Sequence, residues 1–320
     1  MRLRHSAEPV PGTGFIDPHT LARIDNLELL ARTVVDGFIN GLHRAPYLGT
    51  SLDFAEHRAY YPGDDIRRID WRLYARTDRF YLKEYEADTN SNVVVLLDTS
   101  RSMAYGGAGI PKLDYAKFLA ASLLYFSSKQ RDRIGLLTFD SGIVAYVPPS
   151  AKHLDVALHT IDRARPERQG SLESALLRAT ELLRRRGLAV IISDLYEEPA
   201  RVQKAAGMLR HRGHDVIVFH LLDRTEIELD GSSRGMRFDE ATSFEDLETG
   251  ERMPVVTEAV RTRYREMVQD HITALRKLLT KVRVDYALFD TSQPLDHALF
   301  AYLAARERLT RGTARSGGGR

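Results

Sequence analysis

The hydrophobic pattern is strongest between Val93 and Leu97, where five apolar residues, most of them β-branched, follow one another. A short apolar run of this kind is typical of a strand buried on both faces, as in parallel sheets that are covered by helices. The run ends abruptly at Asp98, and Ser100 and Ser102 follow at alternate positions. Because open α/β sheets bind ligands beyond the carboxyl ends of their strands, these three polar residues are candidates for ligand binding.

Downstream of this strand, helical and strand-like patterns alternate. Helical spacing of apolar residues predicts helices over 111–129, 151–164, 171–185, 199–212, 256–282 and 294–308. Apolar runs predict strands over 133–139, 188–193, 213–222 and 284–289, with an antiparallel edge strand over 143–147. Residues 223–255 are polar and interrupt the alternation, so we expect an inserted hairpin there. The whole pattern predicts an α/β fold with a doubly wound, mostly parallel sheet and helices on both faces.

The first 90 residues follow other patterns. Residues 1–17 show no periodicity and are expected to form a flexible arm, whereas apolar positions from Leu21 to Leu42 predict an amphipathic helix. Residues 47–90 are rich in aromatic and charged residues, and we expect a small strand-rich element there, attached to the main sheet. The expected organisation is an arm over 1–17, an N-terminal extension over 18–90, an α/β domain over 91–309 and a disordered tail over 310–320.

Composition narrows the class of protein. Lys and Arg total 46 against 44 Asp and Glu, which gives no general reason to expect nucleic acid or an anionic membrane as a partner. The absence of cysteine excludes disulfides, thiolate metal sites and thiol nucleophiles. No segment approaches the roughly 18 apolar residues that cross a bilayer. We therefore expect a cytoplasmic protein without direct membrane insertion.

Oxygen-bearing side chains occur in two further loops at the same edge of the expected sheet. Ser171 begins one predicted helix, and Asp194 follows the strand predicted over 188–193. Two carboxylates and three hydroxyls then come from Asp98, Ser100, Ser102, Ser171 and Asp194. These hard donors favour Mg2+, with Mn2+ or Ca2+ as alternatives, over zinc or copper. Each residue taken alone also fits a turn or a loop cap.

The motif Asp98-Thr99-Ser100-Arg101-Ser102, with Ser171 and Asp194, resembles the metal-ion-dependent adhesion site of von Willebrand factor type A domains. By strand and helix order, the resemblance covers residues 91–309. It implies that Asp194 acts through water and that a carboxylate from a protein partner completes the metal shell. The family often has threonine where this chain has Ser171, so the hydroxyl is retained.

A second resemblance lies between Tyr60 and Thr77, which is similar to the signature of the family catalogued as domain of unknown function fifty-eight. Members pair this segment with a type A domain and are often encoded beside MoxR-type AAA+ ATPases, which implies a chaperone-like or assembly role with such an ATPase. Opposite charges surround one tryptophan here, which favours a salt-bridged brace, with a docking surface as the alternative. The signature residues are Pro62, Gly63, Asp64, Asp65, Arg67, Asp70, Trp71 and Arg76.

Two enzymatic alternatives remain beside a non-enzymatic interaction module. Asp98 and Asp290 each follow two apolar residues and precede Thr-Ser, which invites comparison with the paired aspartates of aspartic proteases. Those enzymes are almost wholly β, however, and neither Asp-Thr precedes glycine here. A metal-dependent phosphohydrolase with Asp98 as its nucleophile is the other alternative, although Ser100 stands where a second carboxylate is usual.

Overall fold

The computed structural model describes residues 18–24, 26–44, 57–59, 81–83, 91–107, 109–229, 242–247, 250–255, 257–295 and 297–303. The expected arm over 1–17 and tail over 310–320 lie outside these residues. The same holds for the eight signature residues between Pro62 and Arg76. Their predicted roles as a brace or a docking surface stay predictions.

Six strands form the central sheet: β3 (Asn92–Asp98), β4 (Arg133–Phe139), β5 (Ile143–Ser150), β6 (Gly187–Ser193), β7 (Asp215–Leu222) and β10 (Asp285–Asp290). Their order is β10-β7-β6-β3-β4-β5, and only the β4–β5 pair is antiparallel. The chain winds outward in one direction from β3 and in the other from β6. The predicted doubly wound α/β fold is confirmed, and β3 and β6 flank the point where the winding reverses.

Strand β5 continues three residues beyond its expected end at residue 147. The extension contains Pro148 and Pro149, and a strand rarely continues through two prolines. Proline is tolerated here because β5 is the edge strand, where one side of the backbone has no neighbouring strand to hydrogen-bond.

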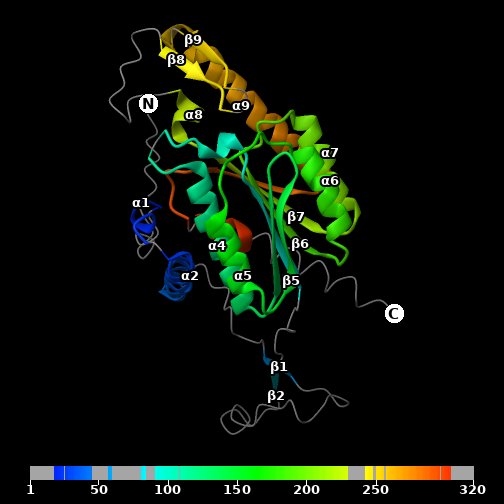
Figure 1. The fold of residues 1–320 in the computed structure, drawn as a ribbon. Coiled ribbons are helices and arrows are strands. Elements are labelled where there is room, and N and C mark those ends of the chain that lie inside the picture. The colour runs from blue at the N-terminus through cyan, green and yellow to red at the C-terminus, as the bar shows by residue number, and fades with distance from the viewer. Residues whose placement is uncertain are drawn as a thin grey trace.

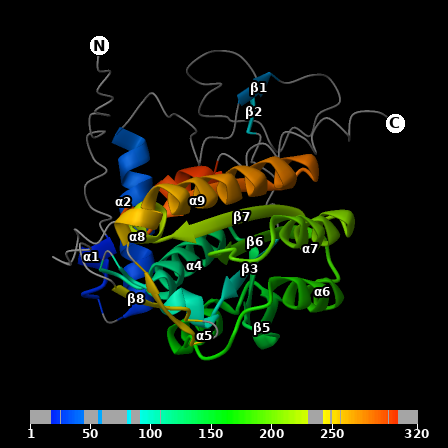
Figure 2. The same ribbon diagram turned by 90° about the horizontal axis from the view of Figure 1, so that it is seen from above.

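Helices cover both faces of the sheet, as Figures 1 and 2 show. The helices are α4 (Lys112–Lys129), α5 (Leu154–Arg163), α6 (Leu172–Leu182), α7 (Pro199–His211) and α9 (Thr257–Lys281). Alternate residues of β3 enter different cores: Val95 packs on the side of α4 and α5, and Leu96 packs on the side of α6, α7 and α9. Burial on both faces explains why this strand is an unbroken apolar run.

The amphipathic segment near the N-terminus forms α1 (Pro18–Leu21) and α2 (Leu27–Arg44) instead of one helix from Leu21. The break arises at Asn26, whose side-chain Oδ1 accepts a hydrogen bond from the backbone N of Leu29 at 2.9 Å and so caps the start of α2. The apolar face of α2 packs against α4 and α5, and its Phe38 ring meets Phe300 edge-on at 4.7 Å. The expectation that this segment lies on another surface is confirmed.

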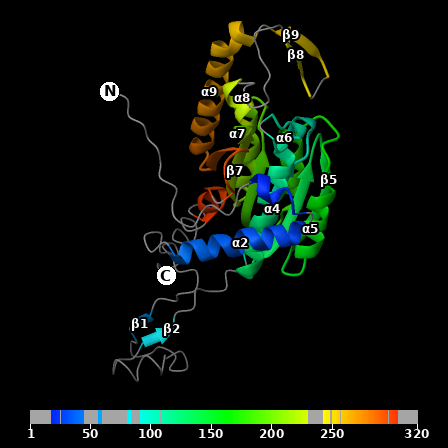
Figure 3. The ribbon, with the colours of Figure 1, turned by 90° about the vertical axis from the view of Figure 1, so that its left-hand side faces the viewer.

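Two small β pairs lie outside the main sheet. β1 (His57–Ala59) and β2 (Tyr81–Lys83) pair with each other in a separate two-stranded sheet, so the expected attachment to the main sheet is wrong for these described strands. Figures 1 and 3 show this pair at a distance from the six strands. The antiparallel hairpin of β8 (Thr242–Glu245) and β9 (Arg252–Val255) lies within the range of the expected insertion, which also contains a short helix, α8 (Arg224–Glu228). Among the described helices, none is long and apolar enough to cross a membrane.

Candidate metal centre

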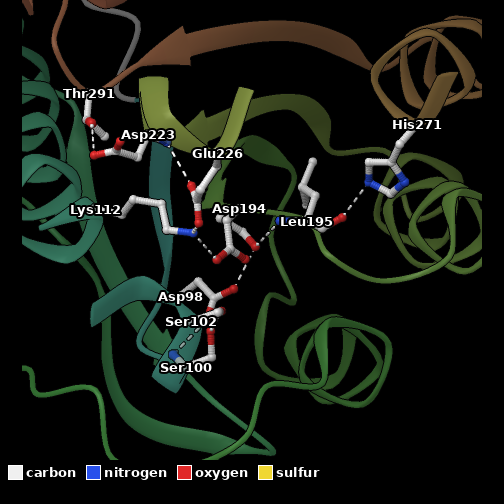
Figure 4. A network of polar contacts seen from close by, with 11 residues as sticks. Asp98, Ser100, Ser102, Lys112, Asp194, Leu195, Asp223, Glu226, His271 and Thr291 are labelled. Atoms are coloured by element: carbon white, nitrogen blue, oxygen red, sulfur yellow. Dashed lines mark hydrogen bonds and ion pairs between the residues drawn. The ribbon is translucent and has the colours of Figure 1, made fainter. Parts of the chain in front are cut away.

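Asp98 ends β3 and turns the chain into the loop that carries the two predicted serine ligands. Its Oδ1 accepts a hydrogen bond from the backbone N of Ser100 at 2.9 Å, which forms a tight turn that ends the strand. The hydroxyl oxygens of Ser100 and Ser102 lie 3.1 Å apart, and all three side chains are buried. The structure therefore brings together the three oxygen donors that the sequence placed on this loop (Figure 4).

The end of β6 lies directly beside this loop. Ser193 donates a hydrogen bond from its Oγ to Asp98 Oδ2 at 2.6 Å, and its Oγ also accepts one from the backbone N of Leu195 at 3.1 Å. Leu195 has a φ of 51°, in the left-handed region that costs a non-glycine residue about 1–2 kcal/mol. This sharp turn, held by a hydrogen bond between Leu195 O and His271 Nε2 at 2.9 Å, fixes Asp194 at the carboxyl end of β6.

A buried lysine, which sequence reasoning missed, completes the centre. Lys112 is the first residue of α4, and its Nζ donates to Asp194 Oδ2 at 2.8 Å and to Glu226 Oε1 at 2.7 Å. The same ammonium lies 4.7 Å from the centroid of the Tyr196 ring. No local sequence signal marks it, because a lysine at a helix start is usually solvated and the two partners of Lys112 lie 82 and 114 residues away along the chain.

Glu226 was also missed, although its own signal is clear. The sequence Asp223-Arg224-Thr225-Glu226 fits a capping box, and the structure shows both of its bonds. Glu226 Oε2 accepts from the backbone N of Asp223 at 2.8 Å, and Asp223 Oδ1 accepts from the backbone N of Thr225 at 2.8 Å. The capping box therefore fixes the carboxylate of Glu226 toward Lys112.

Negative charge exceeds positive charge in this buried cluster. Asp98, Asp194 and Glu226 supply three carboxylates against the one ammonium of Lys112, so two negative charges are in excess when all are ionised. Burial raises the pKa of Asp98 from 3.8 to about 7, and repulsion from Asp194 adds to the rise despite the hydrogen bonds from Ser193 and Ser100. Asp98 is thus the carboxylate whose charge is least compensated.

The pKa of Lys112 shows how the neighbouring carboxylates are balanced. Burial alone lowers this pKa, but the charges and hydrogen bonds of Asp194 and Glu226 outweigh burial and raise it. Lys112 therefore stays protonated at neutral pH and acts as a fixed internal cation between these two carboxylates.

The donor set fits a divalent ion that accepts hydroxyl and water ligands. Nowhere in the described part of the chain do three His, Cys, Asp or Glu side chains gather as a metal-binding group, so a closed zinc-type site does not fit. The uncompensated Asp98 and the paired hydroxyls of Ser100 and Ser102 fit Mg2+, which keeps several waters and needs few carboxylates.

The loop that carries Ser171 packs against the Ser100 loop. Arg101 N donates to Arg168 O at 2.9 Å, and a Cβ added to Gly170 would lie 2.8 Å from Ser100 Cβ. Ser171 itself follows as the N-cap residue of α6, half-buried, with its backbone N bonded to Asp140 O at 2.9 Å. Ser171 is therefore next to the residue that touches the Ser100 loop, and its role as a metal ligand stays a prediction.

Asp290 repeats the local geometry of Asp98 at a different place. Its Oδ1 accepts from the backbone N of Ser292 at 2.8 Å, as Asp98 does from Ser100. The strands β6 and β7 lie between β3 and β10, and three inter-strand spacings separate the two aspartates by about 14 Å. The two carboxylates of an aspartic protease share a proton at about 3 Å, so this alternative is wrong.

Comparison with known proteins gives one family match and several partial structural similarities. A family model described as "Protein of unknown function DUF58" matches residues 56–274. Uncharacterized proteins of Mycobacterium bovis and Mycobacterium tuberculosis are 32% identical over 219 residues, which is 67% of this chain and 68% of theirs.

Two solved structures illustrate the structural similarities. The conserved hypothetical protein BatB from Bacteroides thetaiotaomicron is 17% identical with a TM-score of 0.47, over 68% of this chain and 99% of that one. A von Willebrand factor type A structure from Catenulispora acidiphila is 11% identical with a TM-score of 0.40, over 67% and 42%.

Proposed function

Because the chain belongs to the family described as "Protein of unknown function DUF58", which names no activity, we propose from the site that this protein is a metal-dependent protein–protein interaction module. One observation carries the proposal: the buried and uncompensated carboxylate of Asp98 lies beside the hydroxyls of Ser100 and Ser102, where the winding of the sheet reverses. Ligands of open α/β sheets bind at this position.

The residues divide into ligands and supports. Asp98, Ser100 and Ser102 would hold Mg2+ directly, with Ser171 as a further ligand and Asp194 acting through water. A bound Mg2+ supplies positive charge that attracts an aspartate or glutamate side chain of a protein partner. Ser193 orients the Asp98 carboxylate through its 2.6 Å hydrogen bond, and Mn2+ or Ca2+ is expected to substitute for Mg2+.

The partner we propose is a MoxR-type AAA+ ATPase, with the pair acting in the chaperone-like assembly or maturation of protein complexes in the cytoplasm. The resemblance of the Tyr60–Thr77 segment to the family signature supports this partner, because members are often encoded beside such ATPases. The near-balance of 46 basic and 44 acidic residues supports a protein partner over nucleic acid.

Titration calorimetry with Mg2+ and Mn2+ tests the metal centre. We expect the wild-type protein to bind one ion per chain and Asp98→Ala to bind none. Asp290→Ala is the matched control, because Asp290 forms the same local turn at the end of the edge strand β10. This variant should leave metal binding unchanged. Equal binding by wild type and Asp98→Ala would refute the centre.

Co-purification tests the partner. A purified MoxR-type ATPase from the same organism should bind wild type in Mg2+, lose that binding in EDTA, and fail to bind Asp98→Ala. Retention of the ATPase by Asp98→Ala or in EDTA would show that the metal centre is not the contact.

The phosphohydrolase alternative predicts a different result. Both oxygens of Asp98 accept hydrogen bonds, and Ser100 stands where such enzymes usually have a second carboxylate, which weakens the case for Asp98 as a nucleophile. We therefore propose a non-enzymatic role. A metal-dependent rate on p-nitrophenyl phosphate that is abolished by Asp98→Asn would overturn it.

A further inference from the structure

Lys112 joins three elements that meet at the candidate metal centre. It begins α4, and its fully buried Nζ bonds to Asp194 at the end of β6 and to Glu226 on α8, at 2.8 and 2.7 Å. Figure 4 shows the ammonium between these two carboxylates, with Asp194 on the side of Asp98 and the two serines. An internal cation thus already contacts one of the acidic residues expected to serve the metal.

This position has a direct electrostatic consequence. The negative charge of Asp194 attracts both a metal ion and the ammonium of Lys112. These two cations repel each other, and the repulsion is weakly screened because the site is buried. Resting on the proposed function, we propose that Lys112 is a positioning residue that weakens and sets the metal affinity of the centre. It does so as a permanent counter-ion to Asp194, without contact with the metal.

Glu226 acts on the same balance from the other side. Its carboxylate draws Lys112 toward α8, and the capping box fixes it there through the 2.8 Å bond from the backbone N of Asp223. A second bond, between Tyr105 OH and Thr225 Oγ1 at 2.8 Å, ties α8 to the loop that follows β3. The position of α8 therefore sets the strength of the ion pair between Lys112 and Asp194. Because α8 precedes the β8–β9 hairpin, the metal affinity depends on the position of this segment.

Charge counting gives opposite expectations for two single variants. With three carboxylates and one ammonium, the wild-type excess is two negative charges. Lys112→Met raises the excess to three and removes the competing cation, so Mg2+ should bind at least ten-fold more tightly. Glu226→Gln lowers the excess to one and leaves Lys112 to Asp194, so Mg2+ should bind at least ten-fold more weakly. In the double variant the excess returns to two, and affinity should lie within a few-fold of wild type.

The experiment is titration calorimetry with MgCl2 alone at pH 8 on these three variants and the wild type, with folding checked by circular dichroism. Lys117→Met is the matched control, because Lys117 is a buried lysine of the same helix and its Nζ donates to Asp162 O at 3.3 Å, away from the metal centre. The Mg2+ affinity of this variant should equal that of the wild type. Lys112→Arg keeps the charge and should bind Mg2+ within a few-fold of wild type.

The outcomes separate this inference from the proposed function. If the wild type binds no Mg2+, the proposed function fails. If the wild type binds but Lys112→Met binds no more tightly, or the double variant binds as weakly as Glu226→Gln, the role of Lys112 is refuted while the metal centre stands. Should Lys112→Met fail to fold, Glu226→Gln decides alone, since unchanged affinity in that variant overturns the inference.

Discussion

Replacing Asp98 by asparagine should stabilise the metal-free protein while it abolishes metal binding. A carboxyl group whose pKa is raised on folding binds its proton more tightly in the folded state than in the unfolded state. Its stabilising effect is therefore full below the unfolded value of 3.8 and is lost as the pH rises through about 7. Above that pH, the ionised Asp98 destabilises the metal-free fold, and a neutral amide of the same shape removes this effect.

The magnitude follows from the size of the pKa shift. A rise from 3.8 to about 7 is roughly 3 units, which at about 1.4 kcal/mol per unit makes ionised Asp98 destabilising by about 4 kcal/mol at most. This net shift already includes the opposing effect of the hydrogen bonds from Ser193 and Ser100. The gain for Asp98→Asn at pH 8 in EDTA is therefore about 4 kcal/mol at most, which raises the Tm by up to roughly 8 °C.

Thermal unfolding at pH 8, with EDTA or with excess MgCl2, provides the assay. Mg2+ at about 100 times its Kd stabilises the wild type by about 2.7 kcal/mol and should leave Asp98→Asn unchanged. Addition of Mg2+ should therefore narrow the difference in Tm between the variant and the wild type. Asp290→Asn is the matched control, since it changes the same type of turn at a half-buried position and should follow the wild type in both buffers.

Two results would refute the reasoning. A fall in Tm of Asp98→Asn in EDTA at pH 8 would show that the carboxylate is compensated within the protein. An equal Mg2+-induced rise for wild type and variant would place the ion elsewhere.

Three further predictions test other parts of the structure. Burial lowers the pKa of His220 to about 3, so the unfolded state binds a proton at higher pH than the folded state does, and the free energy of unfolding falls as the pH drops below 6.5. Between pH 7 and 5, denaturant titration should show that the wild type loses about 2 kcal/mol more of its free energy of unfolding than His220→Gln does. Equal losses in the two proteins would contradict this. Gly170→Ala places a Cβ 2.8 Å from Ser100 Cβ, so calorimetry should show weaker Mg2+ binding with an unchanged circular dichroism spectrum, and unaltered affinity would count against the predicted contact. Phe38→Ala removes the ring that packs on Phe300 and should lower the free energy of unfolding by about 3–5 kcal/mol, whereas a loss below about 1 kcal/mol would show that α2 packs loosely.

The fold was predictable because its four central strands are buried on both faces. β3 and β6 are continuous apolar runs, and the helices between strands keep an apolar stripe, so local pattern alone separates the elements. The failures occur where a side chain decides the backbone. Asn26 caps α2 and divides the expected N-terminal helix, and two prolines at an edge strand hid the last residues of β5.

Only the part of the candidate site that lies on a single loop could be predicted from the sequence. Asp98, Ser100 and Ser102 are close in sequence, and a tight turn brings them together. Lys112 lies 82 residues from Asp194 and 114 from Glu226 along the chain, so its partners depend on the packing of the whole sheet. Local sequence also cannot distinguish Asp98 from Asp290, since both form the same turn and only the position of the strand separates a central site from an edge.

The features that fit this site to a cation also make it the costly part of the fold. Leu195 holds a left-handed backbone, Asp98 is buried without a full counter-charge, and Lys112 is buried in an ion pair whose desolvation offsets much of its attraction. The rest of the sheet is apolar and closely packed, so it can support these local losses. A cation that binds the excess charge relieves the largest of them. The left-handed backbone of Leu195 alone does not mark a ligand site, because Leu229 adopts the same conformation at the end of α8. The buried carboxylate excess at the ends of β3 and β6 is therefore the feature on which the proposed cation site depends.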